Sequence, residues 1–331
     1  MLLNCSPTSS LNSPLPIVAG VGPSSQWLPA GDWKTVLEFL IDRYPGVASE
    51  TWLSRMAHGE VVDESGQQLN AESIYRAGTC IFYYRELETE PQIPFTESII
   101  YEDENLLVVD KPHFLPVVPA GRFLHETLLV RLRNQGQPDS LVPAHRLDRE
   151  TAGLVIFSRN LATRGRYTAL FRDRKVEKRY EALAPVLCET DGVRLPATRR
   201  SRIVRGEPFF RMREIDGEPN AETSIEVIER AGDLVRYELR PLTGKKHQLR
   251  VHMAALGIPI LNDRLYPDEV FVAHSDREDD FARPLKLLAR SVAFEDPLTS
   301  ELRYFESAMG LAAECEPQIC ANERGSEQSK P

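Results

Sequence analysis

The stretch that decides the fold is AHRLDRETAGLVIFSRN, residues 144–160. It begins with a cluster of polar residues that Gly153 closes, and a short apolar run, Leu154–Phe157, follows. An apolar run of this length after a glycine is typical of a buried strand. The polar cluster is therefore predicted to be a loop carried by a rigid strand, a common place for catalytic groups.

Asp148 is the candidate reactive group of this loop. It stands between Arg146 and Arg149, and nearby cations favour the ionised form of a carboxyl group at neutral pH. An ionised, positioned carboxylate can act as a nucleophile or a base. Taken alone, however, the charge pattern favours a surface cluster of ion pairs. The choice between these interpretations depends on the rest of the chain.

Four ordered segments resemble RluA-type RNA pseudouridine synthases, and the resemblance covers roughly residues 93–310. His145–Gly153 resembles the HRLD-x-x-T-x-G motif of that family. The segments that resemble its KP turn, its K-x-Y-x-A segment and its TGRTHQ-x-R-x-H segment are Tyr101–Pro112, Lys178–Ala182 and Thr243–His252. Four motifs in the family's order are far more specific than one short pattern.

The resemblance implies that the chain isomerises uridine to pseudouridine in structured RNA, either ribosomal RNA, transfer RNA or both. The reaction breaks the bond from uracil N1 to C1′, turns the base and rejoins it through C5. It needs no redox change, and the resemblance implies no cofactor. The family's catalytic aspartate maps onto Asp148. Attack on C1′, attack on the base and removal of the C2′ proton all remain open for this carboxylate.

The resemblance also gives catalytic roles to Tyr180 and Arg250. Arg250 lies at the family's paired-arginine position, where a bidentate contact would orient Asp148 and keep it charged. Tyr180 lies at the family's tyrosine position, where the ring can stack on uracil and the hydroxyl can assist proton transfer. Without the motifs, a helix-surface arginine and a core tyrosine would be the better interpretations.

Five further residues are candidate contacts to the substrate: Arg146, His145, Val251, Lys178 and His247. A uridine buried in structured RNA must be flipped out, and Arg146 is placed to fill the vacated stack with its guanidinium plane. Val251 is expected to pack against the base. No metal site is expected, because His247 and His252 are five residues apart and do not share a helical face.

The chain departs from the family motifs at Phe114, Ala152, Lys246 and Asn262, where the family usually has Gly, Ser, Thr and Gly. Asp263 and Tyr266 of the segment that includes Asn262 are retained. None of the departures removes a reacting group. They leave the target uridine, and the RNA that contains it, undetermined.

The chain is predicted to have four parts. Residues 1–30 are rich in Ser, Pro and Gly and are expected to be disordered. Residues 31–92 form a small module that loosely resembles the alpha-L RNA-binding module but has few basic residues. It therefore remains open whether this module binds RNA or is only structural. Residues 93–310 form the pseudouridine synthase catalytic domain, and residues 311–331 a flexible tail.

The catalytic domain is predicted to have an α+β fold with a largely antiparallel sheet flanked by helices. Its predicted strands are joined mostly by turns, with only a few helices between them. Ser224–Ile228 and Leu234–Leu239 alternate well enough to be paired strands. A late helix is expected to begin at Thr243 and to end at Gly257. On that helix, His247 and Arg250 are expected to share one face.

The distribution of charge supports an RNA partner only weakly. The net charge is −9, yet residues 141–213 contain 17 Lys and Arg against 8 Asp and Glu. A positive strip on an acidic body suits a phosphate backbone. Internal ion pairs are the simpler explanation of the same charges.

The composition predicts a cytoplasmic monomer without membrane association. The five cysteines are scattered and none has C-x-x-C spacing, which is typical of a reduced, cytosolic chain. No apolar run reaches the length of a membrane span. The N-terminus, MLLNC, lacks the positively charged leader of a secretion signal.

Three other functions compete with isomerisation. An RNA-binding protein without catalysis would be expected to lack Asp148 or Tyr180, and both are present. A glycoside hydrolase would use Asp148 and Glu150, but the chain has no aromatic-rich sugar groove. A metal-dependent phosphoesterase would lose its activity to a chelator. Release of tritium from C5-labelled uridine RNA in excess chelator separates isomerisation from all three.

Overall fold

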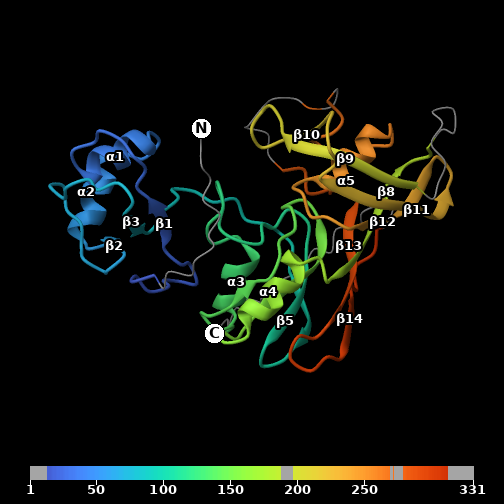
Figure 1. Cartoon of the computed structure of the whole chain (residues 1–331), viewed down its shortest axis with the longest axis horizontal. Helices are drawn as coiled ribbons and strands as arrows, with labels where there is room; N and C mark the ends of the chain where they lie inside the picture. The colour runs from blue at the N-terminus through green and yellow to red at the C-terminus, as the bar shows by residue number, and fades with distance from the viewer. Residues whose placement is uncertain (1–12, 188–196, 269–270, 272–278, 312–331) are drawn as a thin grey trace, which may run out of the picture. The chain divides into compact units, whose positions relative to one another are not determined.

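The computed structural model describes residues 13–187, 197–268, 271 and 279–311, and it divides into two compact units (Figure 1). One unit comprises Met1–Glu90 and Pro119–His125, and the other comprises Pro91–Val118 and Glu126–Pro331. In the described part of the chain, no helix is both long and apolar enough to cross a membrane.

The first unit combines two helices with a small antiparallel sheet. Its elements, in chain order, are β1 (Ser24–Trp27), α1 (Val36–Arg43), α2 (Ser49–Ala57), β2 (Val61–Asp63) and β3 (Cys80–Tyr83). The strands lie in the order β1-β3-β2. The side chain of Thr35 caps α1 by accepting a hydrogen bond from the Glu38 N–H. The helices and the sheet enclose an aromatic core around Phe39, Trp52 and Tyr83.

The expected disorder of residues 1–30 is wrong for the end of that segment. Ser24–Trp27 pairs with Cys80–Tyr83, and its side chains alternate between exposed and half-buried positions. The sequence SSQW offers too little apolar periodicity to reveal such a strand, which depends on its partner. Residues 1–12 and 312–331, and with them nearly all of the expected tail, lie outside the described residues.

The second unit carries most of the strands. They are β4 (Ser98–Glu102), β5 (Leu106–Lys111), β6 (Val142–Pro143), β7 (Ala152–Ser158), β8 (Glu177–Pro185), β9 (Ala197–Arg205), β10 (Met212–Ile215), β11 (Ala221–Ala231), β12 (Leu234–Pro241), β13 (Leu287–Glu295) and β14 (Leu302–Glu306). Its helices are α3 (Leu128–Asn134), α4 (Arg164–Arg172) and α5 (Gln248–Ala255).

These strands form one sheet in the order β10-β9-β11-β12-β8-β13-β7-β5-β4, with β14 beside β13 and β6 beside β7. The pairing of β13 with β7 is parallel, and the other pairs between described strands are antiparallel. The predicted α+β fold with a largely antiparallel sheet is therefore confirmed. The predicted hairpin of β11 and β12 is also present.

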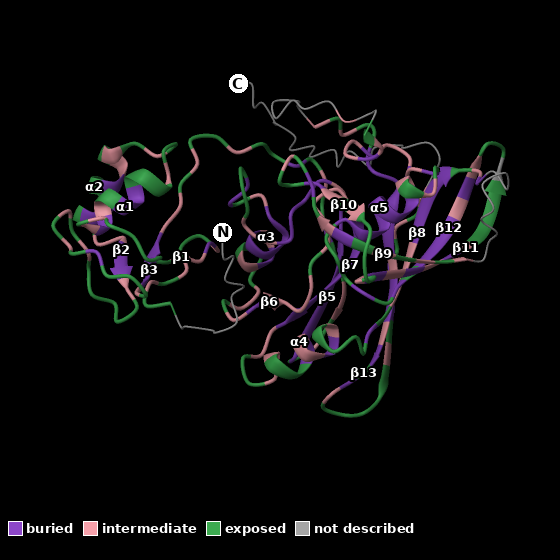
Figure 2. Cartoon of the chain, turned by 45° about the horizontal axis from the view of Figure 1, so that its top comes forward, coloured by how far each residue is buried: buried purple, intermediate pink, exposed green. Residues whose placement is uncertain are grey.

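The sheet has a separate apolar cluster in each half. One joins Leu106, Ile156 and Val292 of the sheet to Tyr167 and Leu170 of α4. The other joins strands β8, β11 and β12 to α5 through Leu249 and Met253. Figure 2 shows β7 and β8 as buried strands near the middle of the second unit. Because every residue of β7 is buried, the strand appears in the sequence as an unbroken apolar run.

The helix expected from Thr243 begins later, at Gln248. The Thr243 hydroxyl instead donates to the Gln248 side-chain oxygen at 2.7 Å, and the Lys245 N–H donates to the same oxygen at 3.1 Å. His247 has a left-handed backbone, with φ of 56°. The segment before α5 is therefore a turn rather than its first helical turn, and the helical face predicted for His247 and Arg250 is wrong.

Two departures from the family's glycines lie where the backbone is left-handed. Phe114 has φ of 65° and Asn262 has φ of 63°. Asparagine tolerates this conformation better than most residues, whereas a bulky side chain there is strained. Phe114 is buried, with its ring stacked on Phe95 at 6.0 Å and edge-on to Phe281 at 5.2 Å. This packing offsets the strain at Phe114.

Gly153→Ala tests the junction between β7 and β13. Gly153 has φ of 109°, and an added Cβ would lie 2.3 Å from the Ala289 carbonyl oxygen. Backbone strain and overpacking together should lower the free energy of unfolding by about 2–6 kcal/mol in urea titrations. Gly165→Ala, in α4 with open space around its Cβ, is the matched control and should be neutral or slightly stabilising. Equal stability of the two variants would contradict this packing.

Candidate active site

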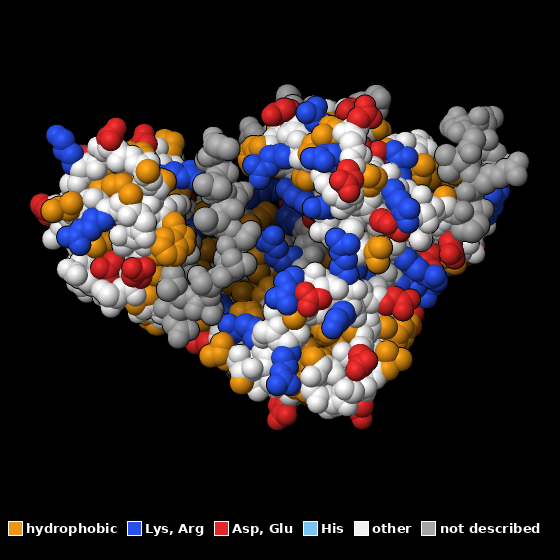
Figure 3. Space-filling view, viewed as in Figure 1, with side chains coloured by type: hydrophobic (Ala, Val, Ile, Leu, Met, Phe, Trp, Pro, Cys, Tyr) orange, Lys and Arg blue, Asp and Glu red, His pale blue; other side chains and the backbone are white. Residues whose placement is uncertain are grey.

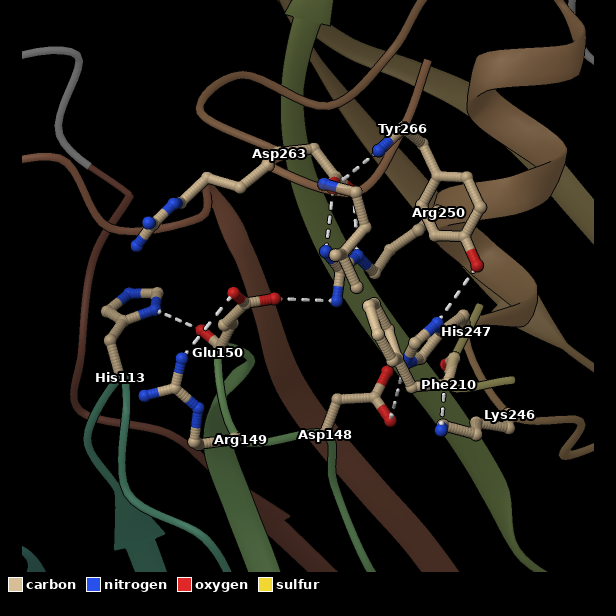
Figure 4. Close-up of polar contacts among 12 residues, drawn as sticks. His113, Asp148, Arg149, Glu150, Phe210, Lys246, His247, Arg250, Asp263 and Tyr266 are labelled. Atoms are coloured by element: carbon tan, nitrogen blue, oxygen red, sulfur yellow. Dashed lines mark hydrogen bonds and ion pairs between the residues drawn. The ribbon is translucent and has the colours of Figure 1, made fainter. Parts of the chain in front are cut away.

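The loop that carries Asp148 is fixed by contacts to Asp148 itself and to the two residues that follow it. Buried Lys111, at the end of β5, donates from Nζ to the Arg149 carbonyl oxygen at 3.1 Å. His113 donates from Nδ1 to the Glu150 carbonyl oxygen at 2.7 Å. The Thr151 N–H donates to the Asp148 carbonyl oxygen at 3.1 Å, which closes a turn. The backbone around Asp148 is thus held in place, as Figure 4 shows for His113 and Glu150.

The Asp148 side chain itself remains free to react. It is 29% exposed, and among the described residues no hydrogen bond to its carboxylate is found. Burial raises the pKa of Asp148, while the positive charges of Arg250, Lys246 and Lys111 oppose the rise. The cations expected from sequence were Arg146 and Arg149. Neither is among the charges that act most on Asp148, and the Arg149 guanidinium instead makes two hydrogen bonds of 2.8 Å to Asp279.

Arg250 is the best-fixed side chain of the site, but Asp148 is not its partner. Its Nε and Nη2 donate to the two carboxylate oxygens of Asp263 at 2.7 and 2.6 Å. Its Nη1 lies 2.8 Å from Glu150 Oε2. The predicted bidentate contact with Asp148 is therefore wrong, since two closer carboxylates occupy the donors of Arg250. Arg250 acts on Asp148 through its charge and by fixing Glu150, two residues further along the loop.

His247 joins Asp148 to Tyr266. The Met212 N–H donates to the Tyr266 hydroxyl at 2.8 Å, and we assign the hydroxyl proton to the 2.9 Å contact with His247 Nδ1. Burial lowers the pKa of His247 to about 3, so the ring is neutral. Its remaining proton is then on Nε2, which lies 3.9 Å from Asp148 Oδ1. A neutral N–H thus faces the carboxylate.

Tyr180 and Val251 have different surroundings. Tyr180 lies in β8 opposite Ala289, and the negative charge of Asp148 adds to burial in raising the pKa of its hydroxyl. The Tyr180 hydroxyl therefore lies close enough to Asp148 for the charge of the carboxylate to act on it. Val251 is buried in an apolar cluster with Ile203 and Tyr266, which is what a core valine does.

Two of the remaining predicted contacts, His145 and Lys178, have surroundings other than Asp148. His145 accepts a hydrogen bond at Nε2 from the Ile156 N–H at 3.1 Å, and its ring stacks on Phe171 at 4.2 Å. Burial lowers the pKa of His145 to about 3, and the nearby positive charge of Lys178 adds to this effect. Arg146 is exposed. His145 therefore packs against β7 and α4.

Several residues of the site had no role assigned from sequence, among them Lys111, Asp263 and Tyr266. Lys111 belongs to the KP turn, and burial lowers its pKa to about 7. Asp263 and Tyr266 are the retained residues of the segment after Asn262, so the motif itself was the signal that could have placed them here. In the described part of the chain, no group of three His, Cys, Asp or Glu is arranged to hold a metal ion.

Comparisons with known proteins agree with this fold and site. Residues 105–255 match the RNA pseudouridylate synthase family. An uncharacterised RNA pseudouridine synthase of Synechocystis is 31% identical over 237 residues, which cover 70% of this chain and 79% of that protein. The dual-specificity RNA pseudouridine synthase RluA of Haemophilus influenzae is 32% identical over 225 residues, which cover 67% of this chain and 97% of that protein.

A solved structure is also similar. The human RNA pseudouridylate synthase domain containing 1 is 28% identical, with a TM-score of 0.51, and the match covers 66% of this chain and 86% of that one. The fold and the site therefore define an RNA-modifying isomerase. The chain belongs to the RluA-type RNA pseudouridine synthase family, whose members convert uridine into pseudouridine in RNA.

Arg250→Met tests the buried ion cluster. It leaves the carboxylates of Glu150 and Asp263 without their shared cation, so the free energy of unfolding should fall by about 3–5 kcal/mol. Arg240→Met, which removes a half-exposed partner of Glu238, is the control and should lower it by less than about 1 kcal/mol. Urea titrations of both variants measure the difference. Similar losses would show that Arg250 does not hold the site together.

Proposed function

We propose that the chain isomerises uridine in ribosomal or transfer RNA with Asp148 as the reacting carboxylate. The observation that carries this proposal is that the backbone of the loop is fixed while the Asp148 side chain remains partly exposed and has no hydrogen bond among the described residues. The name of a yeast mitochondrial relative, tRNA pseudouridine(32) synthase, supports transfer RNA as a substrate class. The proposal of ribosomal RNA as a substrate rests on the sequence motifs alone.

The reaction balances without a cofactor. The N1–C1′ bond breaks, the C5–C1′ bond forms, C5 loses its proton and N1 gains one. Asp148 is proposed to attack C1′ or the base, or to remove the C2′ proton, and each route needs the carboxylate ionised. Arg250, Lys246 and Lys111 oppose the rise of its pKa and so support the ionised form.

The surrounding side chains are proposed to hold and orient the base. Tyr180 is proposed to stack on the uracil ring and to assist proton transfer. His247 is proposed to donate from Nε2 to Asp148 or to a uracil carbonyl oxygen. Arg250 is proposed as a positioning residue that acts through Glu150. Glu150 is already paired with Arg250, which disfavours the glycoside hydrolase alternative.

Asp148→Asn tests the proposed function. The amide keeps the shape of the side chain but lacks its charge, so isomerisation should fall by roughly a thousandfold or more. RNA affinity should change by no more than a few-fold. Tritium release from C5-labelled uridine RNA measures the rate, and excess chelator excludes a metal-dependent hydrolysis. Asp139→Asn, at an exposed position, is the control and should release tritium at the wild-type rate. Full turnover by Asp148→Asn would contradict the assignment.

Arg146 is proposed to fill the stack that the flipped uridine leaves. It is exposed and lies two residues before Asp148, so its guanidinium can reach an RNA duplex bound over the active site. Extruding a stacked base costs a few kcal/mol, whereas an unstacked base needs little of this. The contribution of Arg146 should therefore depend on how well the target uridine is stacked.

Arg146→Ala should slow isomerisation on hairpin RNA about tenfold to a hundredfold and on flexible single strands much less. The slope of log affinity against log salt concentration should change by at most about one, the value for one phosphate contact. Single-turnover rates on both RNAs test this, with exposed Arg166→Ala of α4 as the control. Equal losses on both RNAs, with a large drop in the salt slope, would identify Arg146 as a phosphate clamp.

The first unit is proposed to contribute binding at most. All four motifs lie in the second unit, and residues 13–90 contain 5 Lys and Arg against 11 Asp and Glu, which does not favour phosphate contacts. The protein is proposed to act as a cytoplasmic monomer. The scattered cysteines support a reduced compartment.

A further inference from the structure

The turn between β9 and β10, Gly206–Arg211, presents two exposed aromatic rings. Phe209 is 71% exposed and Phe210 is 37% exposed. The two rings meet edge-on at 5.6 Å, and Phe210 also meets Phe271 edge-on at 6.0 Å. An edge-on contact covers at most one face of a ring, and the exposed fractions show that both rings keep surface open to a ligand.

Two contacts fix this turn beside the active site. The Lys246 ammonium donates to the Phe210 carbonyl oxygen at 2.9 Å. At the end of the turn, the Met212 N–H donates to Tyr266, which contacts His247. Figure 4 shows Phe210 and Lys246 in the group that surrounds Asp148 and His247. The exposed rings therefore lie next to the proposed catalytic carboxylate.

Positive charge accompanies the rings. Arg205 and Arg146 are exposed, and both face Lys246 closely enough to lower its pKa. Among the described residues no ion pair with a carboxylate is found for Arg205, Arg146 or Lys246. Figure 3 shows Lys and Arg side chains gathered on this face of the second unit. Cations that make no ion pair with a carboxylate favour an anionic ligand.

We propose that the β9–β10 turn binds the nucleotide adjacent to the target uridine. The base of that nucleotide stacks on Phe210, and the phosphate that joins it to the uridine contacts Lys246 and Arg205. An aromatic ring beside cations is the usual combination for single-stranded nucleic acid. A protein partner is less suitable, because charged residues are depleted at the core of such interfaces. This inference rests on the proposed function and adds a site that selects the sequence around the uridine.

A double-mutant cycle between protein and RNA tests the stacking. The probe is a hairpin that contains a uridine converted by the wild-type protein in mapped cellular RNA, with an abasic site placed on its 5′ or its 3′ side. Phe210→Ala should weaken binding to the intact hairpin about tenfold, and one abasic hairpin should weaken binding to the wild type equally. Phe210→Ala with that hairpin should lose nothing further. Phe210→Trp should restore binding to the intact hairpin.

Several outcomes separate the possibilities. If Phe210→Ala weakens binding to both abasic hairpins as much as it weakens binding to the intact hairpin, the proposed stacking is wrong. Unchanged RNA binding by Phe210→Ala also contradicts the stacking and would favour a protein partner. Tyr304→Ala, at a 55% exposed position in β14, is the control and should leave binding unchanged. If the wild type converts no uridine in any RNA, the proposed function itself fails. If the wild type converts uridine but Phe210→Ala and the abasic site are not coupled in binding, only the stacking inference is wrong.

The phosphate contact has its own test. Lys246→Thr, which installs the usual residue of the family motif, and Lys246→Met should each lower the salt slope of hairpin binding by about one. An uncharged methylphosphonate between the uridine and the stacked nucleotide should produce the same change in the wild type and none in the variants. If the methylphosphonate lowers the salt slope of the Lys246 variants by as much as it lowers that of the wild type, Lys246 does not contact this phosphate.

Discussion

The buried ion cluster of Arg250 with Glu150 and Asp263 holds the active site together. It joins α5 to the loop after β6, which lies about a hundred residues earlier, and to the segment that follows α5. Glu150 fixes the loop two residues after Asp148. Asp263 also accepts hydrogen bonds from the Tyr266 N–H at 3.1 Å and from the Leu265 N–H at 2.8 Å, so the same carboxylate sets the position of Tyr266. A charge that is almost completely buried is stable only with such partners, and the partners position the reactive groups.

The sequence predicted the strand and the loop that carry Asp148, because β7 is buried along its whole length and therefore appears as an apolar run. It did not predict β9. That strand contains four arginines, and one of them, Arg199, is paired with Glu214 of the neighbouring strand β10. Its strand character depends on such partners rather than on apolar alternation. The partner of Arg250 was missed for a similar reason: the motif showed an arginine beside an aspartate but not which of three nearby carboxylates it would meet.

The departures from the family motifs are explained by backbone conformation and surroundings. Asn262 keeps the left-handed backbone that a glycine adopts easily, and its side chain donates to the Pro284 carbonyl oxygen at 3.0 Å. Phe114 keeps the same conformation by burying its ring, over which the Arg149 guanidinium lies at 5.8 Å. Arg149 follows Asp148 directly, so the aromatic residue also supports the loop. Lys246 replaces a neutral residue and adds a cation beside the carboxylate.

The position of β13 has a consequence for how the chain folds. This strand lies between β7 and β8 in the middle of the sheet, yet Leu287 follows Pro185 by about a hundred residues. Until β13 is synthesised, the strands before it form two half-sheets whose inner edges, β7 and β8, lack a partner. Unpaired edges pair readily with other chains, and contacts between distant residues form slowly. The strands that carry Gly153 and Tyr180, β7 and β8, are thus joined in one sheet only after β13 is in place, so the active site is completed late in folding.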